Sequence, residues 1–244
     1  MTTSNPTLNQ DTFLSAGSSA NPMTLQGTVN KTGILLALVI IPALYTFGQT
    51  TTNPGGATVW MIAGLIVGLI AALVTTFKME WAPITAPVYA IAEGLALGGI
   101  SAMYNLQFHG IVIQAVMLTV GVLGLMLGLY TTRILQPTQK FMMGVFAATG
   151  AIALTYLVSM VLGFFGISVP FIHSNGLFGI GFSVVVVIVA ALNLIMDFGI
   201  IEGGIRARAP KYMEWYGGFS LLVTLVWLYL EILRLLSKLA SRRD

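Results

Sequence analysis

The stretch Leu177–Ile201, with the sequence LFGIGFSVVVVIVAALNLIMDFGII, decides the fold of this chain. Its 25 residues contain a single charged side chain, that of Asp197. A helix needs about 20 predominantly apolar residues to cross the hydrocarbon core of a bilayer. The stretch is therefore long and apolar enough to form a transmembrane helix, and its one acid is a candidate functional residue.

The composition of the whole chain is that of an integral membrane protein. Hydrophobic residues make up 57% of it and charged residues only 8%, whereas soluble domains carry roughly 25% charged residues. The chain has no Cys, which excludes disulfides, thiolate metal sites and cysteine nucleophiles. The net charge of +3 is small and lies in short loops and near the C-terminus, so we expect a lipid bilayer and no nucleic acid as partner.

Apolar runs of similar length recur along the chain, separated by turn-forming Pro, Gly and Asn. They predict seven transmembrane helices, at residues 32–49, 59–76, 86–104, 111–131, 141–165, 177–201 and 216–236. Because the connecting loops are short, consecutive helices are expected to be neighbours. The predicted fold is an all-α integral membrane protein, a seven-transmembrane-helix bundle within residues 31–239.

The ends of the chain are polar. Residues 1–30 are rich in Ser, Thr, Asn and Gln and have few large apolar side chains, so they are predicted to form a flexible N-terminal tail. No short apolar run preceded by basic residues lies near the start, as a secretory signal would require. Residues 240–244 form a short basic C-terminal tail.

The distribution of Lys and Arg predicts the topology. Basic residues in short loops are retained on the cytoplasmic side. The N-terminal tail and the second, fourth and sixth loops contain Lys31, Lys78, Arg133, Lys140, Arg206, Arg208 and Lys211, and the other three loops contain no Lys or Arg. The N-terminus is therefore predicted to be cytoplasmic. Seven crossings place the C-terminus outside, in conflict with the basic residues that follow Glu231; the alternative is a last segment that re-enters the membrane.

Glycines with the spacing G-x-x-x-G occur in three of the predicted helices, where they allow helix backbones to approach closely. The pairs are Gly64 and Gly68, Gly94 and Gly98, and Gly124 and Gly128. We interpret them as packing positions within the bundle.

Three acids lie inside predicted transmembrane helices, where an ionised carboxylate costs roughly 2.5–3.5 kcal/mol. Glu93 adjoins a small-residue face, so it either hydrogen-bonds a neighbouring helix in its protonated form or lines a polar pathway. Asp197 shares a helical face with Asn193. The alternative for Asp197 is an interfacial ion pair with Arg206 or Arg208.

The third acid, Glu231, is followed by Arg234 three residues later and Lys238 seven residues later, all on one helical face. A pair at i and i+3 can satisfy the acid locally. Spacing alone leaves a functional acid and a local ion pair equally open.

The segment around Glu231 resembles the last helix of the Bax inhibitor-1 family. Members usually have an acid after Leu-Tyr-Leu and then a Leu-Leu-Arg-like ending, as Leu228–Glu231 and Leu233–Leu236 have here. Asp197 and Glu93 match acids of the family's sixth and third helices, and the likeness covers residues 23–239. The stretch Ala209–Tyr216, together with residues 23–24 and 30–33, is similar to a bacterial subgroup of this family.

The resemblance implies a bundle whose last helix is central, with two acids on helices six and seven that share a proton. It implies that this pair is a pH-sensitive latch over a calcium leak pathway, and Asp197 and Glu231 occupy the matching positions. Two carboxyl groups in contact titrate as a unit. The second acid is Glu where the family usually has Asp. Asp197 is about one turn from the cytoplasmic end of its predicted helix, whereas Glu231 lies roughly 22 Å past the start of its own; if the two acids do not meet, Glu231 pairs with Arg234.

These observations predict a pH-sensitive cation leak channel of the bacterial inner membrane, with calcium as the expected ion and no bound cofactor. A membrane interaction protein that restrains a partner such as a protease is the first alternative. A proton-coupled carrier is the second, although the sequence has no clear internal repeat. No motif for a nucleophile, a phosphate-binding loop or a metalloprotease site is present, so we expect no enzyme activity.

Overall fold

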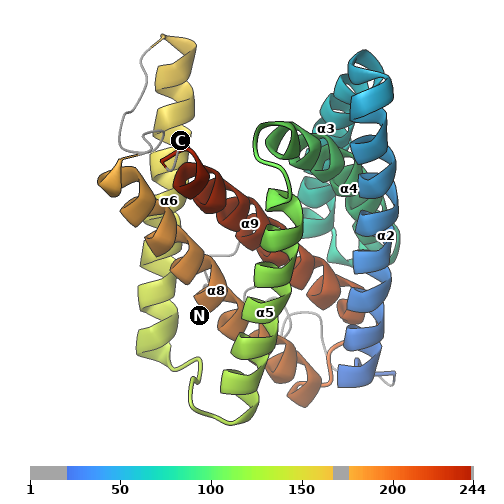
Figure 1. Ribbon diagram of the computed structural model, residues 1–244. Helices are drawn as coiled ribbons and strands as arrows, with labels where there is room; N and C mark the ends of the chain where they lie inside the picture. Colours follow the sequence, from blue (N-terminus) through green and yellow to red (C-terminus); the bar gives the residue numbers. More distant parts are fainter. Residues whose placement is uncertain (1–20, 167–175, 243–244) are drawn as a thin grey trace. The chain divides into compact units, whose positions relative to one another are not determined.

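The computed structural model describes residues 21–166 and 176–242, and every regular element within them is a helix (Figure 1). Seven of these helices are long and apolar enough to cross a membrane, which confirms the predicted all-α, seven-helix membrane protein. The helices are α2 (Leu25–Thr52), α3 (Pro54–Phe77), the short 3-10 helix η1 (Met79–Trp81), α4 (Ala82–Gln107), α5 (Ile111–Thr131), α6 (Gln139–Phe164), α8 (Leu177–Arg206) and α9 (Met213–Ala240).

The helices differ in how much of their surface they bury. In α4, α8 and α9 more than half of the most apolar stretch is buried, whereas in α2, α3, α5 and α6 less than a quarter of it is buried. The exposed side chains on those four helices are largely Leu, Ile, Val and Met, which lipid tails solvate well. Helix α9 is, with α4 and α8, among the helices that bury most of their apolar stretch, and it is one unbroken helix without a re-entrant break.

Most of the helices extend beyond the apolar runs that predicted them, and α2 and α8 are two examples. Helix α2 begins at Leu25, so the predicted tail boundary at residue 30 differs from the structure, and residues 1–20 of that tail lie outside the described residues. The hydroxyl of Thr24 accepts a hydrogen bond from the Gly27 N–H and caps this helix. Helix α8 continues to Arg206. Hydropathy detects only the apolar part of a helix, and polar ends that are capped or packed stay helical.

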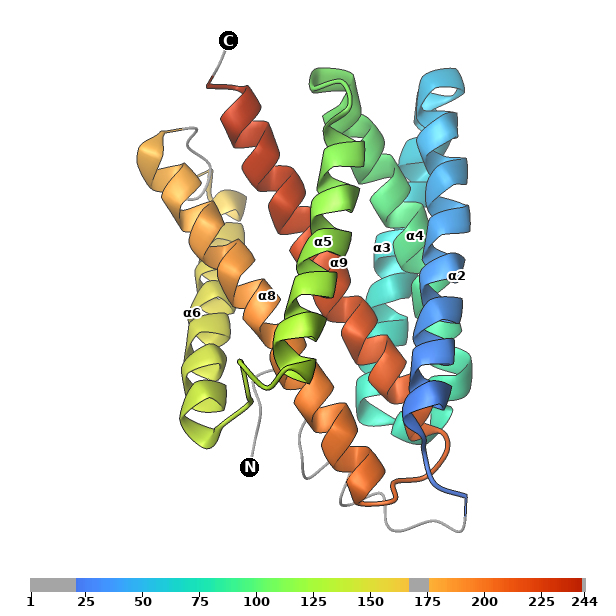
Figure 2. The same ribbon diagram turned by 60° about the horizontal axis from the view of Figure 1, so that its bottom comes forward.

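The chain divides into two compact units, and each is described by itself. The first contains, among the described residues, 21–112 and Ile200–Val223. It comprises α2, α3, η1 and α4 with the adjoining ends of α8 and α9. Helix α4 packs against both α2 and α3, and Figure 2 shows these three helices running alongside one another.

Glycine makes these two packing contacts possible. A Cβ added at Gly94 or Gly98 of α4 would overlap the backbone carbonyls of Val39 and Ala43 in α2. A Cβ at Gly64 of α3 would likewise overlap a backbone carbonyl of α4. The close approach predicted from the first two G-x-x-x-G pairs is therefore present.

The second unit contains, among the described residues, 113–166, 176–199 and 224–242. Its core is formed by Ile152 of α6 with Val186 and Val189 of α8, and Trp227 of α9 packs against them. This cluster fixes the level at which α8 and α9 meet.

The third glycine pair belongs to this unit and does not behave as predicted. A Cβ added at Gly124 or Gly128 of α5 would have nothing within 4 Å. The prediction of close packing is wrong for this pair, because its face of α5 is exposed. The G-x-x-x-G spacing permits close approach of two helices, but close packing also requires a second helix that faces the glycines.

Candidate functional site

Asp197 lies in α8 with a side chain that is 1% exposed. The helix continues to Arg206, so Asp197 is more than two turns from its end. Asn193, one turn earlier on the same face, is also buried. Its Nδ2 donates hydrogen bonds to the Thr149 hydroxyl of α6, at 2.9 Å, and to the Val189 carbonyl, at 2.8 Å. Asp197 is thus a deeply buried acid on a polar stripe of α8.

Glu231 of α9 is the centre of a separate polar cluster in the second unit. Its side chain is 2% exposed. Nη1 of Arg234 donates to both carboxylate oxygens, at 2.9 and 3.1 Å, and the Tyr156 hydroxyl of α6 donates to Oε1 at 2.9 Å. Arg234 also donates to the Tyr156 hydroxyl and lies 5.1 Å from the centre of its ring. The local pair left open by the sequence is therefore formed, and Tyr156 completes it.

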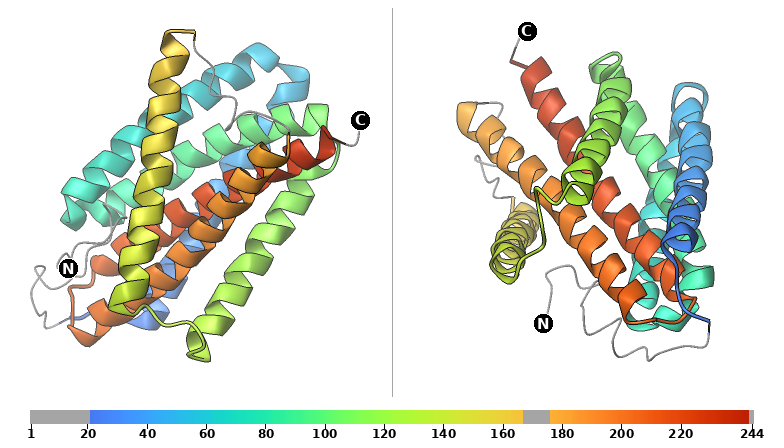
Figure 3. Two further views of the ribbon diagram at one scale, coloured as in Figure 1. Left: turned by 90° about the vertical axis from the view of Figure 1, so that its left-hand side faces the viewer. Right: turned by 90° about the horizontal axis from the view of Figure 1, so that it is seen from below.

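The structure does not bring Asp197 and Glu231 together. Helices α8 and α9 run antiparallel, seen in orange and red in Figure 3, with Lys238 donating to the Gly179 carbonyl and the Ser183 hydroxyl at 3.0 and 2.9 Å. In this register Glu231 lies about two turns from the level of Lys238. Asp197 lies on the other side of the Trp227 contact, roughly 15 Å from Glu231 along the axis at a rise of 1.5 Å per residue.

The remaining predicted residues have other surroundings. Arg206 forms an i, i+4 ion pair with Glu202, and Arg208 is exposed just beyond the end of α8. Neither of these arginines forms a hydrogen bond or ion pair with Asp197 in the described part of the chain.

Glu93 is half-buried in the first unit, on the face of α4 that meets α3. Its Oε2 lies 3.3 Å from where a Cβ on Gly68 would be. Gly68, the second glycine of the Gly64–Gly68 pair, therefore leaves room for the carboxyl group of Glu93. Glu93 belongs to the first unit and Asn193 to the second, and the polar pathway that the sequence analysis assigned to them stays a prediction.

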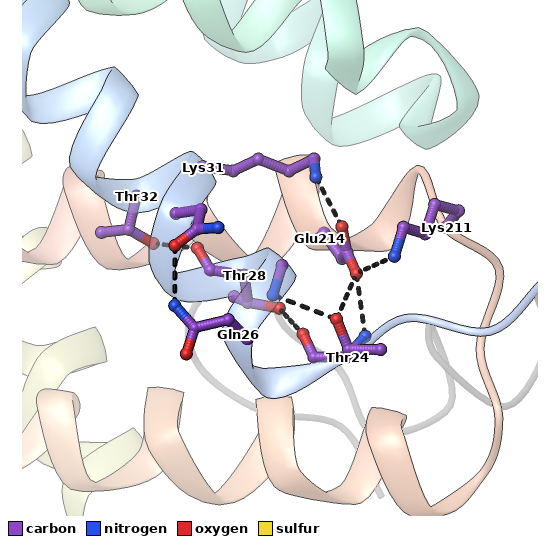
Figure 4. A network of polar contacts seen from close by, with 9 residues as sticks. Thr24, Gln26, Thr28, Lys31, Thr32, Lys211 and Glu214 are labelled. Carbon is purple, nitrogen blue, oxygen red and sulfur yellow. Dashed lines mark hydrogen bonds and ion pairs between the residues drawn. The ribbon is translucent and has the colours of Figure 1, made fainter.

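Sequence reasoning missed a third buried carboxylate, that of Glu214 at the start of α9, which is 0% exposed. The backbone N–H and the hydroxyl of Thr24 both donate to its Oε1 at 2.9 Å. Lys31 donates to its Oε2 at 2.6 Å, and Lys211 lies 2.9 Å from Oε1 (Figure 4). Glu214 adjoins a basic loop, and such an acid ordinarily lies at the membrane surface; its burial depends on contacts 183 and 190 residues distant in sequence.

The described residues contain no group of three or more His, Cys, Asp or Glu side chains that could hold a metal ion. Glu231 and Glu214 form separate clusters with different partners.

The chain was compared with known proteins. A sequence model of the family described as Bax inhibitor 1 like matches residues 5–241. None of the curated proteins and none of the solved structures in the comparison matches the chain. The match covers nearly the whole chain and includes all three membrane-embedded acids of the sequence analysis.

Proposed function

Since this chain belongs to the Bax inhibitor 1 like family, we propose that it lets cations, calcium foremost, leak across a membrane under the control of protons. It acts as a channel without enzyme activity. The observation that carries the proposal is the burial of Asp197, 1% exposed within a membrane-spanning helix. Ionisable residues at such positions are costly and mark ion or proton pathways.

Asp197 is the proton-controlled residue in this proposal. When protonated, it is a neutral hydrogen-bonding group that α8 can bury beside Asn193. When ionised, it favours a nearby cation and water, because a buried charge needs compensation. Carboxylate oxygens are also the ligands that calcium prefers. Cation flux is therefore expected to rise as the pH rises through the titration of Asp197.

Glu231 has a different role. Arg234 and Tyr156 already compensate its charge, so it braces α9 against α6. The proposal thus departs from the shared-proton latch that the resemblance implies, in which Asp197 and Glu231 act as one pair. The separation of the two acids along α8 and α9 supports this departure.

The test is calcium flux into liposomes that contain the purified protein, measured between about pH 5 and 8. Asp197→Asn mimics the protonated acid and is expected to give low flux that no longer depends on pH. Glu202→Gln is the matched control, because Glu202 lies near the exposed end of the same helix. Flux and pH response that are unchanged in Asp197→Asn would overturn the proposal.

The protein is proposed to reside in a bacterial inner membrane with a cytoplasmic N-terminus. The internal bonds of Arg234 and Lys238 support seven crossings. Both residues have partners within the protein, so they contribute less to the charge bias that favours a cytoplasmic C-terminus. Arg234 and Lys238, whose charges conflicted with the predicted topology, are therefore explained by their bonds within the protein.

The alternative function, binding and restraining a membrane protein partner, makes the opposite prediction for the same assay. Liposomes with the wild-type protein would then show no more flux than empty liposomes at any pH. The partner would instead copurify with the full chain and be lost when residues 1–20 are deleted.

A further inference from the structure

The segment from Pro22 to Lys31, ahead of and within the first turns of α2, is joined to the start of α9 in the first unit. Pro22 and Pro210 form an isolated antiparallel bridge, and the Met23 N–H donates to the Ala209 carbonyl at 2.7 Å. Met23 itself is buried. The backbone of this segment is therefore docked onto the loop that leads into α9.

Side chains reinforce the docking around one buried charge (Figure 4). Thr24 and Lys31 of the segment, together with Lys211 of the loop, surround the carboxylate of Glu214. Lys31 also lies 5.7 Å from the centre of the Trp215 ring. Every charged contact of the segment is thus made with the first turn of α9 and the loop before it.

Gly27 is required for this arrangement. A Cβ at position 27 would overlap the carboxyl group of Glu214, whereas a Cβ at Gly33, later in the same helix, would have nothing within 4 Å. The Glu214 carboxyl group therefore occupies the space that a side chain at position 27 would need. This pair of glycines provides a steric test and its control within a single helix.

We propose that residues 22–31 are a releasable clasp on α9. The buried carboxylate makes the clasp two-state. If the segment loosens only partly, Glu214 is left buried without its donors, which is costly. If the segment leaves completely, water reaches Glu214 and replaces them. The ammonium groups of both lysines can be solvated whether the segment is docked or released, since the side chain of Lys31 is 20% exposed and that of Lys211 is 45% exposed.

The clasp acts on the helix that carries Glu231. Helix α9 is unbroken from Met213 to Ala240, so its first turn cannot shift along the axis without shifting the rest. Release of the clasp is therefore the step that frees α9 to move, and a closed clasp holds it. This link to ion conduction rests on the proposed function; docking and release do not.

Release can be measured by thiol labelling, because the chain has no cysteine of its own. In the single-cysteine variant Met23→Cys, a maleimide reacts only when the clasp opens. The folded protein in liposomes is expected to be labelled slowly without denaturant, faster when Gly27→Ala or Glu214→Gln is added, and at an unchanged rate with Gly33→Ala. Labelling that requires global unfolding, or an equal rate in all four proteins, would refute a releasable clasp.

The link to conduction is tested by locking the clasp. Pro22 and Pro210 are directly opposite in the bridge, a geometry with Cα atoms about 4.5–5.5 Å apart that suits a disulfide. Oxidised Pro22→Cys/Pro210→Cys is expected to lose flux and to regain it after reduction, while each single variant is insensitive to oxidant. Equal flux in the oxidised and reduced forms would show that α9 need not be released. If even the wild-type protein conducts nothing, the proposed function fails, and labelling of Met23→Cys still decides whether the clasp opens.

Discussion

Replacing Arg234 by methionine is expected to destabilise the protein more than neutralising its partner Glu231. The two side chains differ in access to water, since Glu231 is 2% exposed and Arg234 is 36% exposed. Arg234→Met leaves a buried carboxylate with only the Tyr156 hydroxyl as donor. Breaking a buried ion pair in this way costs about 3–5 kcal/mol.

Neutralising the acid is a smaller change. In Glu231→Gln the amide keeps most of the shape of the acid, and Arg234 stays bonded to Tyr156 and partly reaches water. The expected cost is that of a hydrogen bond to a charged group, about 1.5–3 kcal/mol. The difference between the two variants therefore follows from which charge is left without a partner.

The double variant Glu231→Leu/Arg234→Met provides the sharper test. It removes both charges, and replacing a buried ion pair by apolar residues is often neutral or stabilising. The double variant is therefore expected to be more stable than Arg234→Met alone, although it carries an additional substitution. Tyr156→Phe, which removes one hydroxyl, serves as a reference at about 1 kcal/mol.

The free energies of unfolding can be obtained by reversible unfolding in mixed micelles, followed by tryptophan fluorescence. Trp227 packs against the core next to this cluster and is a suitable reporter. A double variant less stable than Arg234→Met, or an Arg234→Met protein more stable than Glu231→Gln, would contradict an ion pair whose buried member is the acid.

Three further predictions address the helices. Gly94→Ala is expected to lower the thermal midpoint, because its Cβ overlaps α2 and overpacking costs about 1–3 kcal/mol, whereas Gly33→Ala is expected to leave it unchanged or raise it. A reporter enzyme that is active only outside the inner membrane is expected to be active when fused to the C-terminus and inactive when fused to the N-terminus; the same result at both ends would exclude seven crossings. Glu214→Gln and Glu231→Gln are expected to have additive effects on unfolding free energy, within about 0.5 kcal/mol, because distant sites without shared partners are independent; a larger coupling would contradict their separate networks.

The sequence predicted the features that depend on local spacing or on hydropathy. The seven helices follow from apolar length, and the Glu231–Arg234 pair follows from a separation of three residues on one helix. Glu231 also bonds Tyr156, 75 residues away. No pattern in a single sequence specifies that contact, because it depends on how α6 packs against α9.

The same distinction explains the errors. The start of α2 was predicted too late because residues 25–31 include Gln26, Asn30 and Lys31 and form no apolar run; this part of the helix is stabilised by the Thr24 cap and by Glu214. The Gly124–Gly128 spacing was interpreted as a packing face, but glycine only permits close approach. In both cases the deciding factor is the neighbouring segment, which hydropathy and spacing do not describe.

Helix α9 has one buried carboxylate in its first turn and another in its second half, and each is held by different segments. Glu214 is bound by residues of α2 and of the preceding loop, and Glu231 is bound by Tyr156 of α6 and by Arg234 of its own helix. The two acids are 17 residues apart on one unbroken helix, about 26 Å at 1.5 Å per residue. Displacement of α9 along its axis would separate Glu214 from Thr24 and Lys31, and Glu231 from Tyr156. The loss at Glu214 removes donors from a buried charge, which is costly, whereas the pair of Glu231 with Arg234 would move with the helix. The contacts of Glu214 therefore contribute most of the resistance to such a displacement.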